Sequence, residues 1–197
     1  MNFLAHLHIA QYCQSDLQGN LLGDFVKGDP SGKYPTDVVN GIRLHRFVDK
    51  YTDTHPQILA LKMLFPKPLK RFAPIALDMF WDHCLAKHWS QFHTEPLKRF
   101  IEQSRSECQH RNYAVPASFV TTTNAMWQGE WLLSYQDLTS IQYALERMSH
   151  RSERMTPLAE CGDTLETHYE ILTKTFLLIY PEVLEQAKIF ASQQSKV

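Results

Sequence analysis

The residue types that set up tight turns, zinc knuckles and disulfide frameworks are scarce in this chain of 197 residues. It has only 7 glycines and 4 cysteines, and no two cysteines form a CxxC pair. The thiols are therefore expected to be reduced and structural. No apolar run approaches the roughly 18 residues of a membrane span, and "MNFLAHLHIAQ" lacks the basic start and cleavage site of a signal peptide. We expect a cytoplasmic protein with no membrane contact.

The chain also lacks an excess of charge of either sign, because its formal net charge is −1. A balance so close to neutral gives no electrostatic argument for a nucleic acid partner. Alternating strand patterns are rare, and no glycine-rich nucleotide-binding fingerprint is present. The sequence therefore predicts an all-α fold, and its length fits one domain over residues 1–197 with disorder only in the tail from about residue 191.

Helical periodicity fills most of the chain. Asp163 and Glu166 have the spacing of a capping box at the start of the last helical segment, and Pro181 is expected to kink or split that segment. The predicted helices cover approximately residues 36–55, 74–89, 95–110, 117–131, 137–150 and 163–190.

Residues 41–55, "GIRLHRFVDKYTDTH", place an imidazole and two carboxylates four residues apart. His45, Asp49 and Asp53 therefore fall within a narrow arc of the predicted helix, beside its apolar face. Such an arc predicts polar side chains that are partly withdrawn from water. It makes His45 a candidate ligand, and Asp49 a candidate ligand or ligand partner.

The predicted helix "PIALDMFWDHCLAKHW" places Asp78 and Asp82 on its apolar face. A buried carboxylate without a partner is costly, so the chain should supply a cation, a hydrogen-bond cage or a metal ion. His83 is next to Asp82 and completes an Asp-His pair. Each residue has a structural alternative, since Asp78 can pair with an arginine and His83 can cap or pack.

Two further segments contribute polar residues between apolar neighbours: Asp24 in "GNLLGDFVKG", and His6 and His8 in "LAHLH". On a helix the two histidines point about 200° apart, so at most one of them is expected to join a given site, and His6 is a further candidate ligand. A lone Asp in a glycine-flanked stretch can equally be a turn residue. Imidazole and carboxylate donors without thiolate suit Mn²⁺, Mg²⁺ or Fe²⁺, with Zn²⁺ as a further option. A hydrolytic metal centre is the leading hypothesis.

The sequences of these segments, and their order along the chain, resemble those of a known family over nearly the whole chain. "MNFLAHLHIA", "GNLLGDFVKG", "GIRLHRFVDKYTDTHP", "APIALDMFWDHCLAKHWSQF" and "ALERMSHR" together look like acyl carrier protein phosphodiesterase. The resemblance implies hydrolysis of holo acyl carrier protein to apo carrier protein and 4'-phosphopantetheine, which removes the prosthetic group used in fatty acid biosynthesis. It also implies a helical bundle related to HD-type metal-dependent phosphohydrolases, with Mn²⁺ as the preferred ion.

The site residues that the resemblance implies are Asp24, His45, Asp82 and His83 as metal ligands. The order Asp82-His83 reverses the His-Asp dyad of the HD class, so ligands cannot be copied position by position. Asp24, Asp49, Asp78 and His6 form the catalytic set. In that set Asp49 or Asp78 accepts a proton from the attacking water, and His6 protonates the leaving serine.

Acyl carrier proteins are acidic, so the resemblance also implies a basic docking surface. Three basic sets are candidates: Lys67, Lys70 and Arg71, then Arg43, Arg46 and Lys50, and finally Arg147, Arg151 and Arg154. The first set has the best claim, because it directly precedes the helix that carries Asp78 and Asp82. Two other functions remain open from the sequence. One is an HD-type phosphohydrolase of nucleotides or small phosphate esters, and the other is a carrier-protein-binding protein without catalysis.

Overall fold

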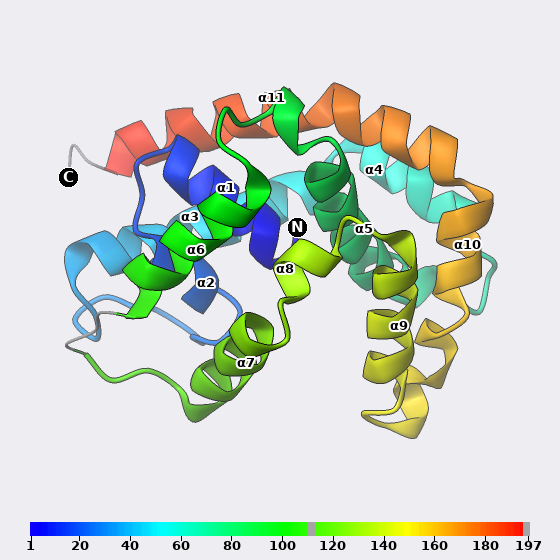
Figure 1. The fold of residues 1–197 in the computed structure, drawn as a ribbon, viewed down its shortest axis with the longest axis horizontal. Coiled ribbons are helices and arrows are strands. Elements are labelled where there is room, and N and C mark those ends of the chain that lie inside the picture. Colours follow the sequence, from blue (N-terminus) through cyan, green and yellow to red (C-terminus); the bar gives the residue numbers. More distant parts are fainter. Residues whose placement is uncertain (110–112, 195–197) are drawn as a thin grey trace.

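The computed structural model describes residues 1–109 and 113–194, and throughout these ranges the regular structure is helical (Figure 1). The predicted all-α fold is therefore confirmed. Short 3₁₀ helices at Lys62–Leu64, Lys70–Phe72, Trp89–Gln91 and Glu153–Leu158 join some of the helices. The α-helices are α1 Phe3–Tyr12, α2 Leu17–Leu22, α3 Thr36–Thr54, α4 Pro56–Leu61, α5 Ala73–Lys87, α6 Leu97–Gln109, α7 Ala117–Gln128, α8 Trp131–Ser134, α9 Leu138–Ser149, α10 Cys161–Thr167 and α11 Tyr169–Gln194.

Five predicted helices correspond to α3, α5, α6, α7 and α9, with ends that differ by a few residues. Residue 110, the expected end of one of them, lies outside the described residues. The short helices α2, α4 and α8 and the apolar α1 are not among the predicted elements. Within the described ranges, no helix is both long enough and apolar enough to span a membrane.

The last predicted segment differs most from the structure. The break falls at His168, and α11 continues through Pro181 as one long helix (Figure 1). Tyr180 and Val183 are buried on either side of this proline, and packing of α11 along α3 keeps the helix continuous there. α10 begins at Cys161, so Asp163 lies in its first turn and is not the N-cap. Residues 191–194 of the expected disordered tail belong to α11, and residues 195–197 lie outside the described part.

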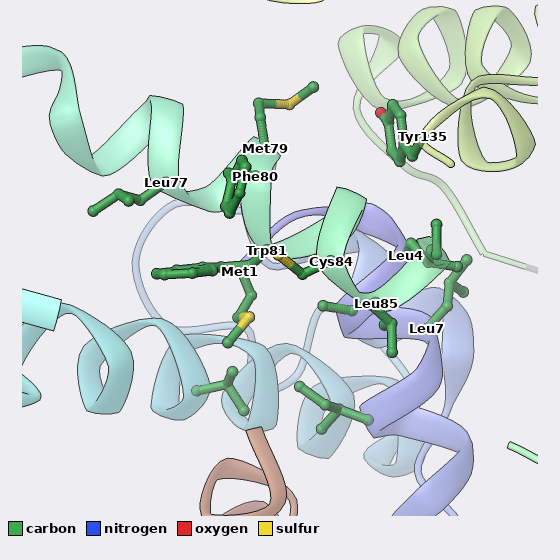
Figure 2. Packing of buried hydrophobic residues seen from close by; sticks show 14 of the residues in the cluster. Met1, Leu4, Leu7, Leu77, Met79, Phe80, Trp81, Cys84, Leu85 and Tyr135 are labelled. Atoms are coloured by element: carbon green, nitrogen blue, oxygen red, sulfur yellow. The ribbon is translucent and has the colours of Figure 1, made fainter. Parts of the chain in front are cut away.

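Helices α1 and α5 form the centre of the fold and are buried on almost every side. Every residue from Leu4 to Ala10 is buried, as expected for a short helix that is apolar all round. α1 packs against α5, and Figure 2 shows side chains of both helices, among them Leu4, Leu7 and Leu85, within one apolar core. Four polar side chains of these two helices, those of His6, His8, Asp82 and His83, are therefore buried among packed neighbours.

Helices α2 and α3 approach each other at backbone distance. A Cβ atom added to Gly41 of α3 would lie 2.9 Å from the Cα atom of Gly19 in α2. Any side chain at these positions would push the helices apart. This close contact sets the segment after α2, which contains Asp24, directly beside α3.

Candidate metal centre

Three polar side chains from α1 and α3 converge on one point. His6, His45 and Asp49 each offer a donor atom, and the three atoms lie within 4.8 Å of one another. Nε2 of His6 lies 3.1 Å from Oδ1 of Asp49, and Nε2 of His45 lies 2.9 Å from Oδ2. The two imidazole rings stack with their centroids 3.7 Å apart, and both are buried. One carboxylate thus bridges two rings from different helices.

Asp24 approaches the same point from the segment after α2. Its Oδ1 atom lies 3.3 Å from Nε2 of His45, while 59% of its side-chain surface is exposed. On the other side of the ring, Nδ1 of His45 donates to the carbonyl oxygen of Asn20 at 2.7 Å. That bond assigns the proton to Nδ1, so Nε2 is the atom that faces the carboxylates.

The ring of His45 lies directly on the backbone of Gly23. A Cβ atom at residue 23 would be 2.1 Å from both Cγ and Cδ2 of His45. Only glycine leaves room for the ring in this position. The glycine before Asp24 therefore has a specific task, which is to let His45 reach Asn20 and the carboxylates together.

The charges of the three groups are strongly coupled. Burial lowers the pKa of His6 to about 4, with the neighbouring His45 acting in the same direction. Burial also opposes the charge on His45, but hydrogen bonds to Asp24 and Asp49 outweigh it and raise the pKa of His45 to about 9. The pKa of Asp49 is held well below its usual range, because the two histidines overcome the effect of burial. These pKa shifts favour a protonated His45 and a neutral His6 beside the Asp24 and Asp49 carboxylates.

Asp78 joins the group through the α-amino group of Met1. This ammonium lies 2.6 Å from Oδ1 of Asp78 and 3.5 Å from Oδ1 of Asp49. The Asp78 side chain keeps 41% of its surface exposed. The partner of Asp78 is thus the Met1 ammonium and not the arginine considered from the sequence. Asp78 lies at the solvent side of the group.

The His6, His45 and Asp49 group fits a divalent metal ion. Two ligands that are each about 2.1 Å from an ion at right angles lie about 3 Å apart, as these nitrogen and oxygen atoms do. Two imidazoles and a carboxylate are donors suited to Mn²⁺, Fe²⁺ or Zn²⁺. The other ring nitrogen of His6, the buried Nδ1 atom, has no hydrogen-bond partner among the described residues. Oδ1 of Asp24 is 3.3 Å from Nε2 of His45, but Asp24 lies outside this group of three.

Asp82 is buried as predicted, but the structure gives it a different partner from the expected metal ion. Its carboxylate accepts hydrogen bonds from the backbone N–H groups of Leu4 at 2.7 Å and Ala5 at 3.0 Å, with Asn2 at 3.3 Å. These are free donors of the first turn of α1, and the helix dipole favours a negative charge there. Asp82 therefore anchors the helix that carries His6.

His83 also lies away from the His6, His45 and Asp49 group. Its Nδ1 atom donates to the carbonyl oxygen of Tyr135 at 2.8 Å, and its Nε2 atom is 2.9 Å from the hydroxyl of Tyr169. Both ring nitrogens are occupied, about 100° round the helix from Asp82. The metal-ligand set of Asp24, His45, Asp82 and His83 is therefore not one compact site.

The two N-terminal histidines separate as helical spacing predicts. His8 is buried on the far side of α1, 2.8 Å from the Tyr180 hydroxyl and 3.3 Å from the carbonyl oxygen of Phe92. His6 alone faces α3. The i, i+4 spacing of His45 and Asp49 was the available signal for this site, whereas no local pattern indicated that His6 would stack on His45.

The chain is similar to known proteins over almost its whole length. The sequence model of the acyl carrier protein phosphodiesterase family matches residues 1–183. A protein of that name from Enterobacter sp. (strain 638) is 42% identical over 189 residues, which is 95% of this chain and 98% of the relative. Those from Photorhabdus laumondii and Escherichia coli O45:K1 are 41% and 40% identical, again over 95% of this chain and over 96% and 97% of the relatives. No solved structure matches the chain. The chain belongs to the acyl carrier protein phosphodiesterase family.

Proposed function

We propose that this protein is a metal-dependent phosphodiesterase that hydrolyses holo acyl carrier protein to apo carrier protein and 4'-phosphopantetheine. The observation that carries the proposal is the convergence of His6, His45 and Asp49 in a chain of this family. We also propose a relationship to HD-type phosphohydrolases, which the pairing of histidine and aspartate donors from neighbouring helices supports.

In this proposal His6, His45 and Asp49 hold the ion, and Asp24 lies beside them as a fourth donor. When bound, the ion, Mn²⁺ by preference with Mg²⁺, Fe²⁺ or Zn²⁺ as alternatives, would lower the pKa of a water molecule and neutralise negative charge on the phosphodiester oxygens. Asn20 fixes the orientation of the His45 ring through its carbonyl oxygen. Asp82 fixes the turn of α1 that precedes His6. Both supports reduce the movement needed when the site binds its substrate.

Asp78 is our choice for the group that accepts a proton from the attacking water. Its carboxylate is partly exposed and one of its oxygens contacts the Met1 ammonium, whereas both oxygens of Asp49 are engaged by histidines. His6 fits a ligand role better than the proton-donor role expected from the sequence. Its side chain is only 2% exposed, and its Nε2 atom faces Asp49, which leaves no path to a leaving serine.

The carrier protein would dock on the basic segment that leads into α5. Lys67 and Arg71 are exposed, and Lys70 is half-buried. The Arg71 guanidinium donates to the carbonyl oxygen of Arg154 at 3.0 Å, which holds this side chain in place. An acidic partner would be attracted by this surface, and the attraction would weaken with salt.

The test compares Asp49→Asn with Asp53→Asn, two changes one turn apart on α3. Asp49 contacts both histidines, whereas Asp53 is exposed and pairs with Lys62 at 3.0 Å. Release of 4'-phosphopantetheine from holo carrier protein, followed by chromatography, should fall at least about 100-fold in Asp49→Asn and stay near wild type in Asp53→Asn. Equal rates in the two variants would contradict the assigned centre.

A further inference from the structure

The guanidinium group of Arg46 ties the segment after Asp24 to the helix that carries His45. Its Nη1 atom donates to the carbonyl oxygen of Gly28 at 2.7 Å, and its Nη2 atom donates to the carbonyl oxygen of Val26. Arg46 directly follows His45 in α3, yet its side chain points to this loop while the ring of His45 points into the metal centre. Two consecutive residues of α3 therefore contact the proposed metal centre and the loop after Asp24.

The segment that Arg46 contacts, from Val26 to Gly28, begins two residues after Asp24. The Asp24 carboxylate is one of the contacts of His45. The N–H groups of Phe25 and Val26 donate to the carbonyl oxygen of Leu22, so the chain makes a tight turn at this point. Gly28, at a φ of 71°, then turns the chain away toward the next loop. Asp24 itself is mostly exposed, and its carboxylate contacts Nε2 of His45. Its position depends on the backbone on either side.

We propose that Arg46 is a positioning residue, which clamps Val26 and Gly28 so that the Asp24 carboxylate stays against Nε2 of His45. The planar fork of arginine can bond two carbonyl oxygens at once, whereas the single ammonium of lysine cannot match both. The catalytic consequence rests on the function proposed above. The mechanical consequence, an ordered Asp24 segment, does not.

Arg43 supplies a matched control from the same helix and the same loop. Its Nη2 atom donates to the hydroxyl of Ser31 at 2.8 Å and lies 3.9 Å from Oδ1 of Asp29. Arg43 thus holds the loop at a point farther along the chain from Asp24. Removing it deletes the same charge and a similar number of contacts without touching Val26 or Gly28.

The experiment compares Arg46→Ala, Arg46→Lys and Arg43→Ala in the full-length protein. Amide hydrogen exchange of Phe25 and Val26 is measured without metal, Mn²⁺ affinity is measured by titration, and kcat/KM is measured on holo carrier protein. Arg46→Ala should speed exchange at both amides about 10-fold and lower kcat/KM roughly 10- to 100-fold. Its melting temperature should stay near wild type, because the side chain is half-exposed. Arg46→Lys should be intermediate, and Arg43→Ala should match wild type in exchange and in kcat/KM.

Two results would overturn the role of Arg46. One is unchanged exchange at Phe25 and Val26 in Arg46→Ala, and the other is an equal acceleration in Arg43→Ala. If the wild-type protein does not hydrolyse holo carrier protein, the proposed function fails, and the exchange measurement alone then decides the role of Arg46. Faster exchange in Arg46→Ala only, with kcat/KM unchanged in an active enzyme, would also overturn the positioning of a catalytic group.

Discussion

Replacing Gly23 with alanine tests the geometry of the centre with a single methyl group. The new Cβ atom would lie 2.1 Å from Cγ and Cδ2 of His45, whereas carbon atoms in good contact are about 3.5 Å apart. The ring or the Gly23 backbone must therefore move by roughly 1.4 Å. Movement of the ring breaks its 2.7 Å bond to the Asn20 carbonyl and its 2.9 Å contact with Asp49.

The backbone at residue 23 would not itself oppose the change. Gly23 has φ −48° and ψ −43°, a helical conformation that alanine favours over glycine by about 0.5–1 kcal/mol. Overpacking in a core typically costs about 1–3 kcal/mol, so the net loss of stability should be about 1–2 kcal/mol. For a chain of this length that lowers the melting temperature by only about 2–8 °C. A 1 Å displacement at a catalytic group, by contrast, costs on the order of 100-fold in rate.

Gly162→Ala in α10 is the control for Gly23→Ala. Its added Cβ atom would meet the flexible side chain of Gln142 at 3.1 Å, and its three nearest atoms all belong to Gln142 and to no residue of the proposed metal centre. We expect near-normal kcat/KM and Mn²⁺ affinity for Gly162→Ala, and a loss of about 100-fold in kcat/KM with weakened Mn²⁺ binding for Gly23→Ala. Thermal melts, metal titration and steady-state kinetics measure these effects. Wild-type activity in Gly23→Ala would refute the inference that His45 must stay where it lies.

Two further predictions concern Asp82 and the docking surface. Burial outweighs the backbone N–H bonds and raises the pKa of Asp82 from 3.8 to about 7, so its contribution to stability is complete below about pH 4 and is lost as pH rises toward 7. The stability advantage of wild type over Asp82→Asn, from denaturant unfolding of the metal-free protein, should therefore shrink by roughly 2–3 kcal/mol between pH 5 and pH 8; an advantage that grows with pH would contradict this. Neutralising Lys67, Lys70 and Arg71 together should raise KM for holo carrier protein and flatten its salt dependence while sparing a small phosphodiester, and equal losses on both substrates would remove the docking role.

The sequence was sufficient for the parts of the site that depend on one helix. Periodicity placed His45 and Asp49 on one face of α3, and helical spacing separated His6 from His8. Burial of Asp82 also followed from its position on an apolar face. These predictions needed only the local geometry of an α-helix.

Contacts between helices were beyond what the sequence could supply. Asp82 received a metal role because a buried carboxylate needs a partner, but its partner is the first turn of α1, almost 80 residues earlier in the chain. His83 was paired with Asp82 because the two are adjacent, yet neighbours on a helix point in different directions. The reach of Arg46 to the Asp24 segment likewise depends on how α2 and α3 pack, which is set by close contact at Gly19 and Gly41.

Mass spectrometry of holo acyl carrier protein tests the central claim most directly. The carrier protein is incubated with enzyme stripped of metal, with the same enzyme resupplied with Mn²⁺, and with resupplied enzyme in excess chelator. We predict conversion to apo carrier protein, with release of 4'-phosphopantetheine, only in the resupplied sample, because the His6, His45 and Asp49 group is assigned to hold the ion. Full conversion by enzyme verified to be free of metal, or no conversion with any divalent ion, would contradict the account.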